Sequence, residues 1–154
     1  MIQTSIIGDR FMSPKVFEAA LPAGAFDCRL HELAWPDEPF VNACEAGELA
    51  GLKEFMGEPE QIVQMIGDAR VLITHLAPVS ASILERCPKL ELIGVSRGGP
   101  VNIDRDACRA RGVAALATSA LLLKSGFAHA CVLLVACLIE KGEEWNPVAA
   151  AETL

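Results

Sequence analysis

The sequence predicts an α/β domain built on an open parallel sheet of about five strands, with helices on both faces. Two observations predict it. Short apolar runs bounded by turn residues alternate with segments of helical spacing over about the first 118 of 154 residues. Apolar residues also make up 52% of the chain and charged residues 21%, so the chain can bury enough surface to fold.

Five segments are predicted strands because each is an apolar or alternating run that ends at turn residues. The two runs in the middle of the chain are almost wholly apolar, which is typical of parallel strands buried on both faces. The predicted strands are 2–8, 26–33, 71–74, 90–95 and 113–117.

Five segments between these strands are predicted helices. The first starts at Ser13-Pro14, where a cap residue precedes a proline suited to the first helical turn, and Pro22 and Gly24 end it. The others show apolar residues at helical spacing or end at proline or glycine. They are 45–56, 59–66, 80–87 and 104–111.

Residues 119–154 differ in character from residues 1–118, so the chain is divided into two parts at this point. The segment Phe127 to Ile139 is strongly apolar, and we expect it to form a buried or interface helix. A membrane span needs about 20 apolar residues, and Lys124, Ser125 and Gly126 interrupt the run before that length. We therefore expect no membrane contact, but a helix that docks on a second domain or on another copy, giving a homo-oligomer.

Charge and cysteine pattern exclude several classes. The net charge is −7 and no basic cluster is present, which excludes nucleic acid as a partner. No basic leader precedes an apolar stretch at the N-terminus, so we expect a cytoplasmic protein. The six cysteines show no Cys-x-x-Cys spacing, and we interpret them as small buried side chains rather than metal ligands.

Two loops after predicted strands are the candidate site, because open parallel sheets bind ligands at the carboxyl ends of their strands. The first loop, 74–80, contains His75. That histidine is either an ordinary loop residue or a donor to a bound acid. The second loop, 96–104, contains Arg97, Gly98 and Gly99, where exposed N–H groups and a guanidinium are suited to a carboxylate.

Residues 68–112 resemble the D-isomer-specific 2-hydroxyacid dehydrogenases. The resemblance rests on a strand, a helix ending in Pro88-Lys89-Leu90, a further strand, a glycine-containing loop, and then Asn102-Ile103-Asp104. Weaker agreement in the order of elements extends over residues 1–118.

The resemblance implies a two-domain, NAD(P)-dependent oxidoreductase that acts on the CH–OH group of a small D-2-hydroxy acid or on the matching 2-keto acid. Its first domain, which the resemblance places at residues 1–118, is flavodoxin-like and binds the substrate, and residues 119–154 are then a divergent interdomain-type helix and tail. By the resemblance Arg97, Gly98 and Gly99 hold the substrate carboxylate, while Leu76 and Ala77 line the pocket. Many family members have glycine where this chain has Arg97.

The chain also departs from the family pattern. It has no Gly-x-Gly-x-x-Gly turn for a dinucleotide, and the family's catalytic arginine, acid and histidine cannot be assigned. The sequence after Thr118 diverges as well. We therefore expect a substrate-binding domain truncated before the NAD-binding domain and inactive alone. The alternative is a non-catalytic carboxylate-binding or protein-interaction module.

Overall fold

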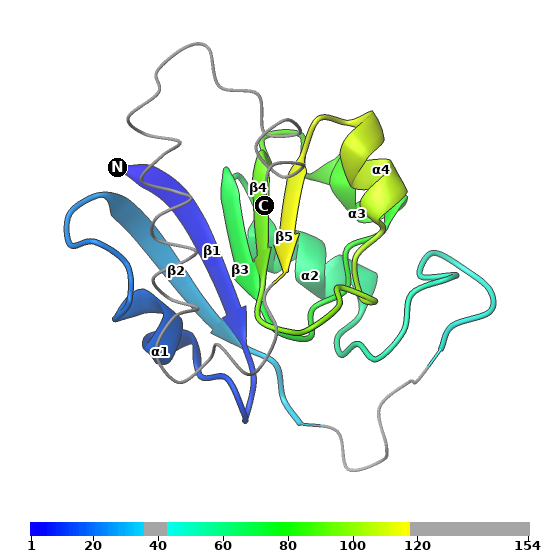
Figure 1. Cartoon of the computed structure of the whole chain (residues 1–154), viewed down its shortest axis with the longest axis horizontal. Helices are drawn as coiled ribbons and strands as arrows, with labels where there is room; N and C mark the ends of the chain where they lie inside the picture. Colours follow the sequence, from blue (N-terminus) through cyan, green and yellow to red (C-terminus); the bar gives the residue numbers. More distant parts are fainter. Residues whose placement is uncertain (36–42, 118–154) are drawn as a thin grey trace.

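The computed structural model describes residues 1–35 and 43–117. These residues form a single five-stranded sheet in the order β2-β1-β3-β4-β5 (Figure 1), and every pair of neighbouring strands is parallel. This is the flavodoxin-like order. The predicted fold class is confirmed within the described residues, whereas the predicted helix at 127–139 lies outside them.

The strands begin and end close to the predicted positions, because each apolar run stops at a turn residue. Strands β1 and β3 match the prediction at both ends, and β2, β4 and β5 are one or two residues shorter. The strands are β1 (Ile2–Gly8), β2 (Phe26–Glu32), β3 (Val71–Thr74), β4 (Leu92–Val95) and β5 (Ala114–Ala117).

In the described part of the chain, four helices lie on the two faces of the sheet. Helix α1 (Pro14–Glu18) packs on β1 and β2 from one side, while α2 (Pro59–Ile66), α3 (Ala81–Arg86) and α4 (Arg105–Ala110) lie on the other side (Figure 1). Helix α1 ends earlier than the predicted spacing indicated. The start of each helix is marked by a proline or by a capping side chain.

The core is divided by the sheet into two clusters of buried side chains. Along β1, Ile6 packs with Phe17 of α1 on one face, while Ile7 packs with the other three helices. In β3, Leu72 belongs to the same cluster as Ile7, and Ile73 belongs to the same cluster as Ile6. Alternation of this kind follows from the two-residue period of a strand, and it explains why β3 and β4, which are buried on both faces, are almost wholly apolar.

The predicted helix at 45–56 is wrong. The segment 43–58 consists of turns and loop, with Gly47, Gly51 and Gly57 at φ values of 82°, 84° and 97°. These left-handed positions interrupt a helix repeatedly. The segment still buries Leu52 and Phe55 against the core. Its apolar spacing therefore indicates that one side of a loop is buried, and it does not indicate a helix.

In the described residues, no helix is long and apolar enough to cross a membrane. Of the described cysteines, Cys87 and Cys108 are buried in the core, and Cys28 and Cys44 are partly buried. Burial, followed by the charge of Asp104, raises the pKa of Cys108 to about 12, so this thiol behaves as a packing group.

Candidate functional site

The carboxyl ends of the five strands meet at one edge of the sheet, where the arrowheads of Figure 1 point. Asp9 follows β1, His75 follows β3, and Ser96 follows β4. Strands β1 and β3 are direct neighbours, although the chain runs from β1 to β2 on the opposite side. Ligands of doubly wound folds bind at such a point of reversal. This edge is therefore the candidate site.

Asn102 joins the two predicted binding loops. Its side chain is fully buried, and Nδ2 donates to the carbonyl oxygen of Ala77 at 2.8 Å. The backbones of the loops also pair, because Val79 N–H donates to Asn102 O and Asp104 N–H donates to Val79 O. The Asn-Ile-Asp sequence thus holds the β3–α3 and β4–α4 loops side by side. Sequence reasoning noted the motif but not this positioning role.

Arg97 is largely covered and already engaged within the chain. Its Nη1 donates to the backbone oxygen of Glu54 at 2.9 Å, and Nη2 is paired with the Glu54 carboxylate. Glu54 has a φ of 50°, a left-handed conformation that non-glycine residues rarely adopt. A guanidinium has five N–H donors, so three remain after these two contacts. Glu54, which sequence reasoning missed, stands beside the residue predicted to hold an anion.

The glycines of the second loop present backbone donors. Within residues 1–35 and 43–117, the N–H groups of Gly98 and Gly99 donate to no protein acceptor. Gly98 is exposed. Gly99 has a φ of 154°, in a region that favours glycine, and a β-carbon added there would meet open space. The loop therefore offers unpaired donors in a conformation that depends on glycine.

Leu76 and Ala77 lie beneath this edge rather than on its surface. Their side chains are 4% and 0% exposed and belong to the core packed under α2, α3 and α4. The carbonyl oxygen of Leu76 accepts from Met56 N–H of the segment 43–58. Direct contact of these two side chains with a ligand stays a prediction.

Asp9 and His75 form a pair that sequence reasoning did not assemble. The distance from His75 Nδ1 to Asp9 Oδ2 is 2.7 Å, and the Asp9 side chain is fully buried whereas His75 is 20% exposed. Asp9 Oδ1 also accepts the N–H groups of Phe11 and Met12. Burial alone would raise the pKa of Asp9, but the bonds from His75 and from these backbone groups hold it below its ordinary value. The Gly8-Asp9 turn after a buried strand was the available signal.

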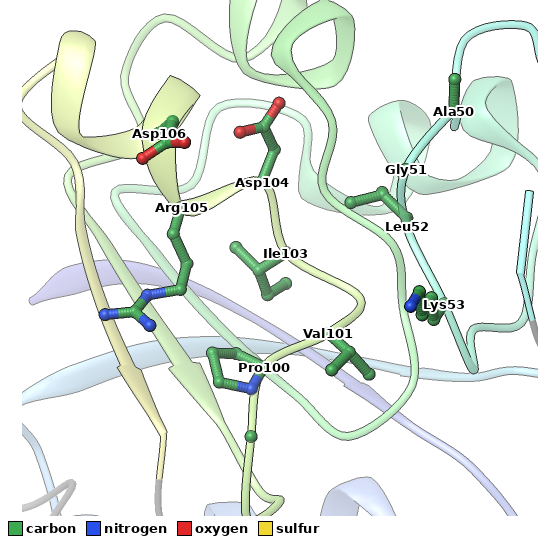
Figure 2. A pocket seen from close by; sticks show the side chains of 11 residues that line it. Ala50, Gly51, Leu52, Lys53, Pro100, Val101, Ile103, Asp104, Arg105 and Asp106 are labelled. Atoms are coloured by element: carbon green, nitrogen blue, oxygen red, sulfur yellow. The ribbon is translucent and has the colours of Figure 1, made fainter. Parts of the chain in front are cut away.

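A pocket of about 530 Å³ lies beside the second loop, between the loop's outer part and the segment 43–58 (Figure 2). Of the predicted site residues, Gly99 lines it. Figure 2 shows Lys53 facing the loop that carries Val101. The lining residues are Ala50, Gly51, Leu52, Lys53, Gly99, Pro100, Val101, Ile103, Asp104, Arg105 and Asp106.

The helix N-termini after β3 and β4 do not fit the pyrophosphate of a dinucleotide. A pyrophosphate is bound by open N–H groups at a helix N-terminus after a glycine-rich turn. Helix α4 is instead capped by Asp104, whose carboxylate accepts from Ala107 N–H at 2.9 Å. Helix α3 is capped by the Ser80 hydroxyl, which accepts from Ile83 N–H. The acidic cap on α4 would also repel a phosphate.

Comparison with known proteins agrees with this geometry. Residues 40–125 match the family model of the D-isomer specific 2-hydroxyacid dehydrogenase catalytic domain, which is more than half of the chain. The chain belongs to this family.

Two known proteins are similar to this chain over part of their own length. A hydroxypyruvate reductase of Blautia hydrogenotrophica is 29% identical over 82 residues, which cover 53% of this chain and 24% of the reductase. The fold is similar to the crystal structure of a protein described as a D-3-phosphoglycerate dehydrogenase oxidoreductase from Ralstonia solanacearum. The TM-score is 0.52 at 16% identity, covering 77% of this chain and 30% of that one. The chain thus spans under a third of either relative.

Proposed function

We propose that this chain is the substrate-binding domain of an NAD(P)-dependent oxidoreductase that acts on the CH–OH group of a small D-2-hydroxy acid. The observation that carries the proposal is the loop Arg97-Gly98-Gly99. It lies at the carboxyl edge of the sheet with a guanidinium and with two backbone N–H groups that have no acceptor among residues 1–35 and 43–117. Family membership supplies the substrate class, because the family is named for 2-hydroxy acids. The cytoplasmic location stays a prediction.

The loop would hold the carboxylate in two ways. The N–H groups of Gly98 and Gly99 are donors suited to a carboxylate oxygen, and Arg97 adds positive charge beside them. Glu54 neutralises part of that charge and competes for the guanidinium. Substrate affinity should therefore depend on both Arg97 and Glu54, in opposite directions.

Calorimetric titration with pyruvate, glyoxylate and hydroxypyruvate tests this proposal. We expect Arg97→Ala to weaken binding by about tenfold or more, the equivalent of one charge-assisted hydrogen bond. We expect Glu54→Gln to strengthen binding, because the competing charge is lost. Arg70→Ala is the matched control, since Arg70 pairs with Glu91 at the amino end of the sheet. Equal affinity of the wild type and Arg97→Ala would contradict the proposal.

Catalysis by this chain alone is not expected. The 154 residues contain no Gly-x-Gly-x-x-Gly turn, and the described helix N-termini after β3 and β4 are capped by side chains. Incubation with NADH and the same three acids should give no oxidation of NADH. Turnover by the purified chain would refute this part of the proposal, while leaving the acid-binding part to the titration.

The rival function is a non-catalytic carboxylate-binding or interaction module, and the same experiments address it. Such a module would bind the acids through the Arg97 loop without belonging to a working enzyme. It is distinguished by the behaviour of the chain with a separately supplied dinucleotide-binding domain of the family. If adding that domain gives turnover that depends on Arg97, the result supports the dehydrogenase. If the chain binds the acids but no turnover follows, the result favours the module.

A further inference from the structure

The pair formed by Asp9 and His75 occupies the point of the sheet where a ligand is expected. It joins the ends of β1 and β3, which lie side by side in Figure 1 and are paired through Ile7 and Thr74. From this point the chain leaves β1 toward β2, and it leaves β3 toward α3 on the other face. In open α/β sheets, a point where the connections diverge in this way is where ligands bind.

Asp9 fixes the orientation of the imidazole. Its Oδ1 is held by the N–H groups of Phe11 at 2.8 Å and Met12 at 3.1 Å, and its Oδ2 meets His75 Nδ1. A carboxylate only accepts hydrogen bonds, so the proton of this contact belongs to Nδ1. In the neutral imidazole Nε2 is then an acceptor, and in the imidazolium Nε2 becomes a donor.

The outer ring nitrogen of His75 is available to a ligand. Within the described part of the chain Nε2 has no protein partner, and it is not among the buried polar atoms that lack one. Arg97, another basic residue at this end of the sheet, is held by Glu54. Within the described residues, Nε2 of His75 is therefore an uncommitted polar group directly after β3.

We propose that His75, in its protonated form, donates from Nε2 to the carboxylate of the small acid, and that Asp9 is the positioning residue that selects this state. The inference rests on the proposed function and deepens it, because it makes acid binding a proton-linked event. A carboxylate is itself only an acceptor, so it binds the imidazolium and not the neutral ring that Asp9 enforces. Affinity should then be higher at acidic pH, where more of the rings carry a proton on both nitrogens.

Other charged residues lie on the elements that flank the Asp9–His75 pair. Arg10 follows Asp9 after β1, and Glu32 ends β2 next to Gly8 in register. Arg97 lies in the loop after β4 and is paired with Glu54 of the segment 43–58. Asp9 stays ionised across the neutral range because its pKa is held low, so it does not produce the expected dependence itself.

The test is titration of pyruvate into the wild type and variants at several pH values from about 5.5 to about 8, the range in which histidine ordinarily titrates. The wild type should lose affinity by up to about tenfold per pH unit on the alkaline side, because only the protonated fraction binds. In Asp9→Asn, the amide Oδ1 still accepts from Phe11 and Met12, while Nδ2 donates to His75 Nδ1. The neutral ring then carries its proton on Nε2, and affinity should become nearly independent of pH.

Two further variants and one spectrum complete the design. His75→Gln keeps a neutral donor, and it should also lose the pH dependence. Asp27→Asn, a matched change of an exposed aspartate that accepts from Gln3, should behave as the wild type. Nitrogen-15 shifts of the ring, assigned by the loss of signal in His75→Gln, should show Nδ1–H in the neutral wild type and Nε2–H in Asp9→Asn.

The outcomes separate the two proposals. Binding of pyruvate with the same pH dependence in the wild type and His75→Gln overturns the role of His75 and leaves the proposed function standing. A neutral wild-type ring protonated on Nε2 overturns the role of Asp9. No pyruvate binding at any pH overturns both proposals. A thermal melt confirms that each variant is folded, and His75→Gln decides the question if Asp9→Asn does not fold.

Discussion

Gly8 ends β1 at a position where a side chain has no room. A β-carbon there would lie 2.4 Å from the backbone oxygen of Met12 and 2.6 Å from two atoms of Pro14. The chain turns back at this point so that Asp9 N–H can donate to Met12 O. The glycine therefore permits the tight turn that buries the Asp9 carboxylate beside His75.

We expect Gly8→Ala to lower the free energy of unfolding by about 1 to 3 kcal/mol, the usual cost of overpacking. The backbone on both sides must move to accommodate the added carbon. Urea unfolding followed by circular dichroism measures the change. Gly24→Ala is the control, because its added β-carbon meets nothing within 4 Å and only its φ of 80° disfavours alanine. A Gly8→Ala loss no larger than that of Gly24→Ala would contradict the steric explanation.

Single residues at the site were only partly predictable. Arg97, Gly98 and Gly99 could be chosen because an arginine and two glycines follow a buried strand. Glu54 could not, because its contact with Arg97 crosses 43 positions of sequence and depends on the left-handed turn at Glu54. Asp9 was missed for a similar reason, since its partner His75 is 66 positions away.

At the scale of elements, helices and strands were predicted correctly where the local sequence signal and the tertiary packing favour the same conformation. Helix α2 matches its predicted range because proline starts it, glycine follows it, and Ile62 and Ile66 both face the core. The segment 45–56 shows similar apolar spacing but contains glycines that take left-handed conformations. Spacing indicates which residues are buried, while backbone conformation decides whether a helix carries them.

Helix α4 depends on its N-cap, and it follows the loop that Asn102 holds. Asp104→Ala should lower the free energy of unfolding by about 0.5 to 2 kcal/mol, because the bond to Ala107 N–H is lost. Asp106→Ala in the same helix is the control. Its side chain is 94% exposed and pairs with Arg109, so we expect a change under about 0.5 kcal/mol.

Chemical denaturation of both variants measures this difference. Asp104→Asn keeps a side-chain oxygen at the cap and should recover most of the loss. If Asp104→Ala and Asp106→Ala are equally stable, the cap does not stabilise the helix in the way proposed.

At the scale of the whole molecule, the buried carboxylate of Asp9 makes the free energy of unfolding depend on pH. Its pKa in the folded state lies below the ordinary value of 3.8. The stabilisation is therefore fully present above pH 3.8 and is lost as the pH falls through the lower folded-state pKa. We expect the wild type to exceed Asp9→Asn in unfolding free energy by about 1 to 3 kcal/mol near neutral pH, the usual contribution of hydrogen bonds to a charged group.

This difference should shrink as the pH is lowered below 3.8, because protonated Asp9 no longer differs from asparagine in charge. Unfolding in urea at a series of pH values measures it. Asp27→Asn, at an exposed position, should show little difference from the wild type throughout. A gap between the wild type and Asp9→Asn that stays constant into strong acid would show that the carboxylate's charge is not its source.

The sequence by itself determined the class of fold, the ends of most strands and helices, and the membership in a 2-hydroxyacid dehydrogenase family. These depend on apolar runs, on proline and glycine at element ends, and on a motif contained in a short stretch, all of which are local. The tertiary structure alone decided that Asp9 contacts His75, that Glu54 pairs with Arg97, and that Asn102 connects the two loops. The physical reason is that parallel strands distant in sequence end at one edge, so the groups that complete the site become neighbours only when the sheet forms.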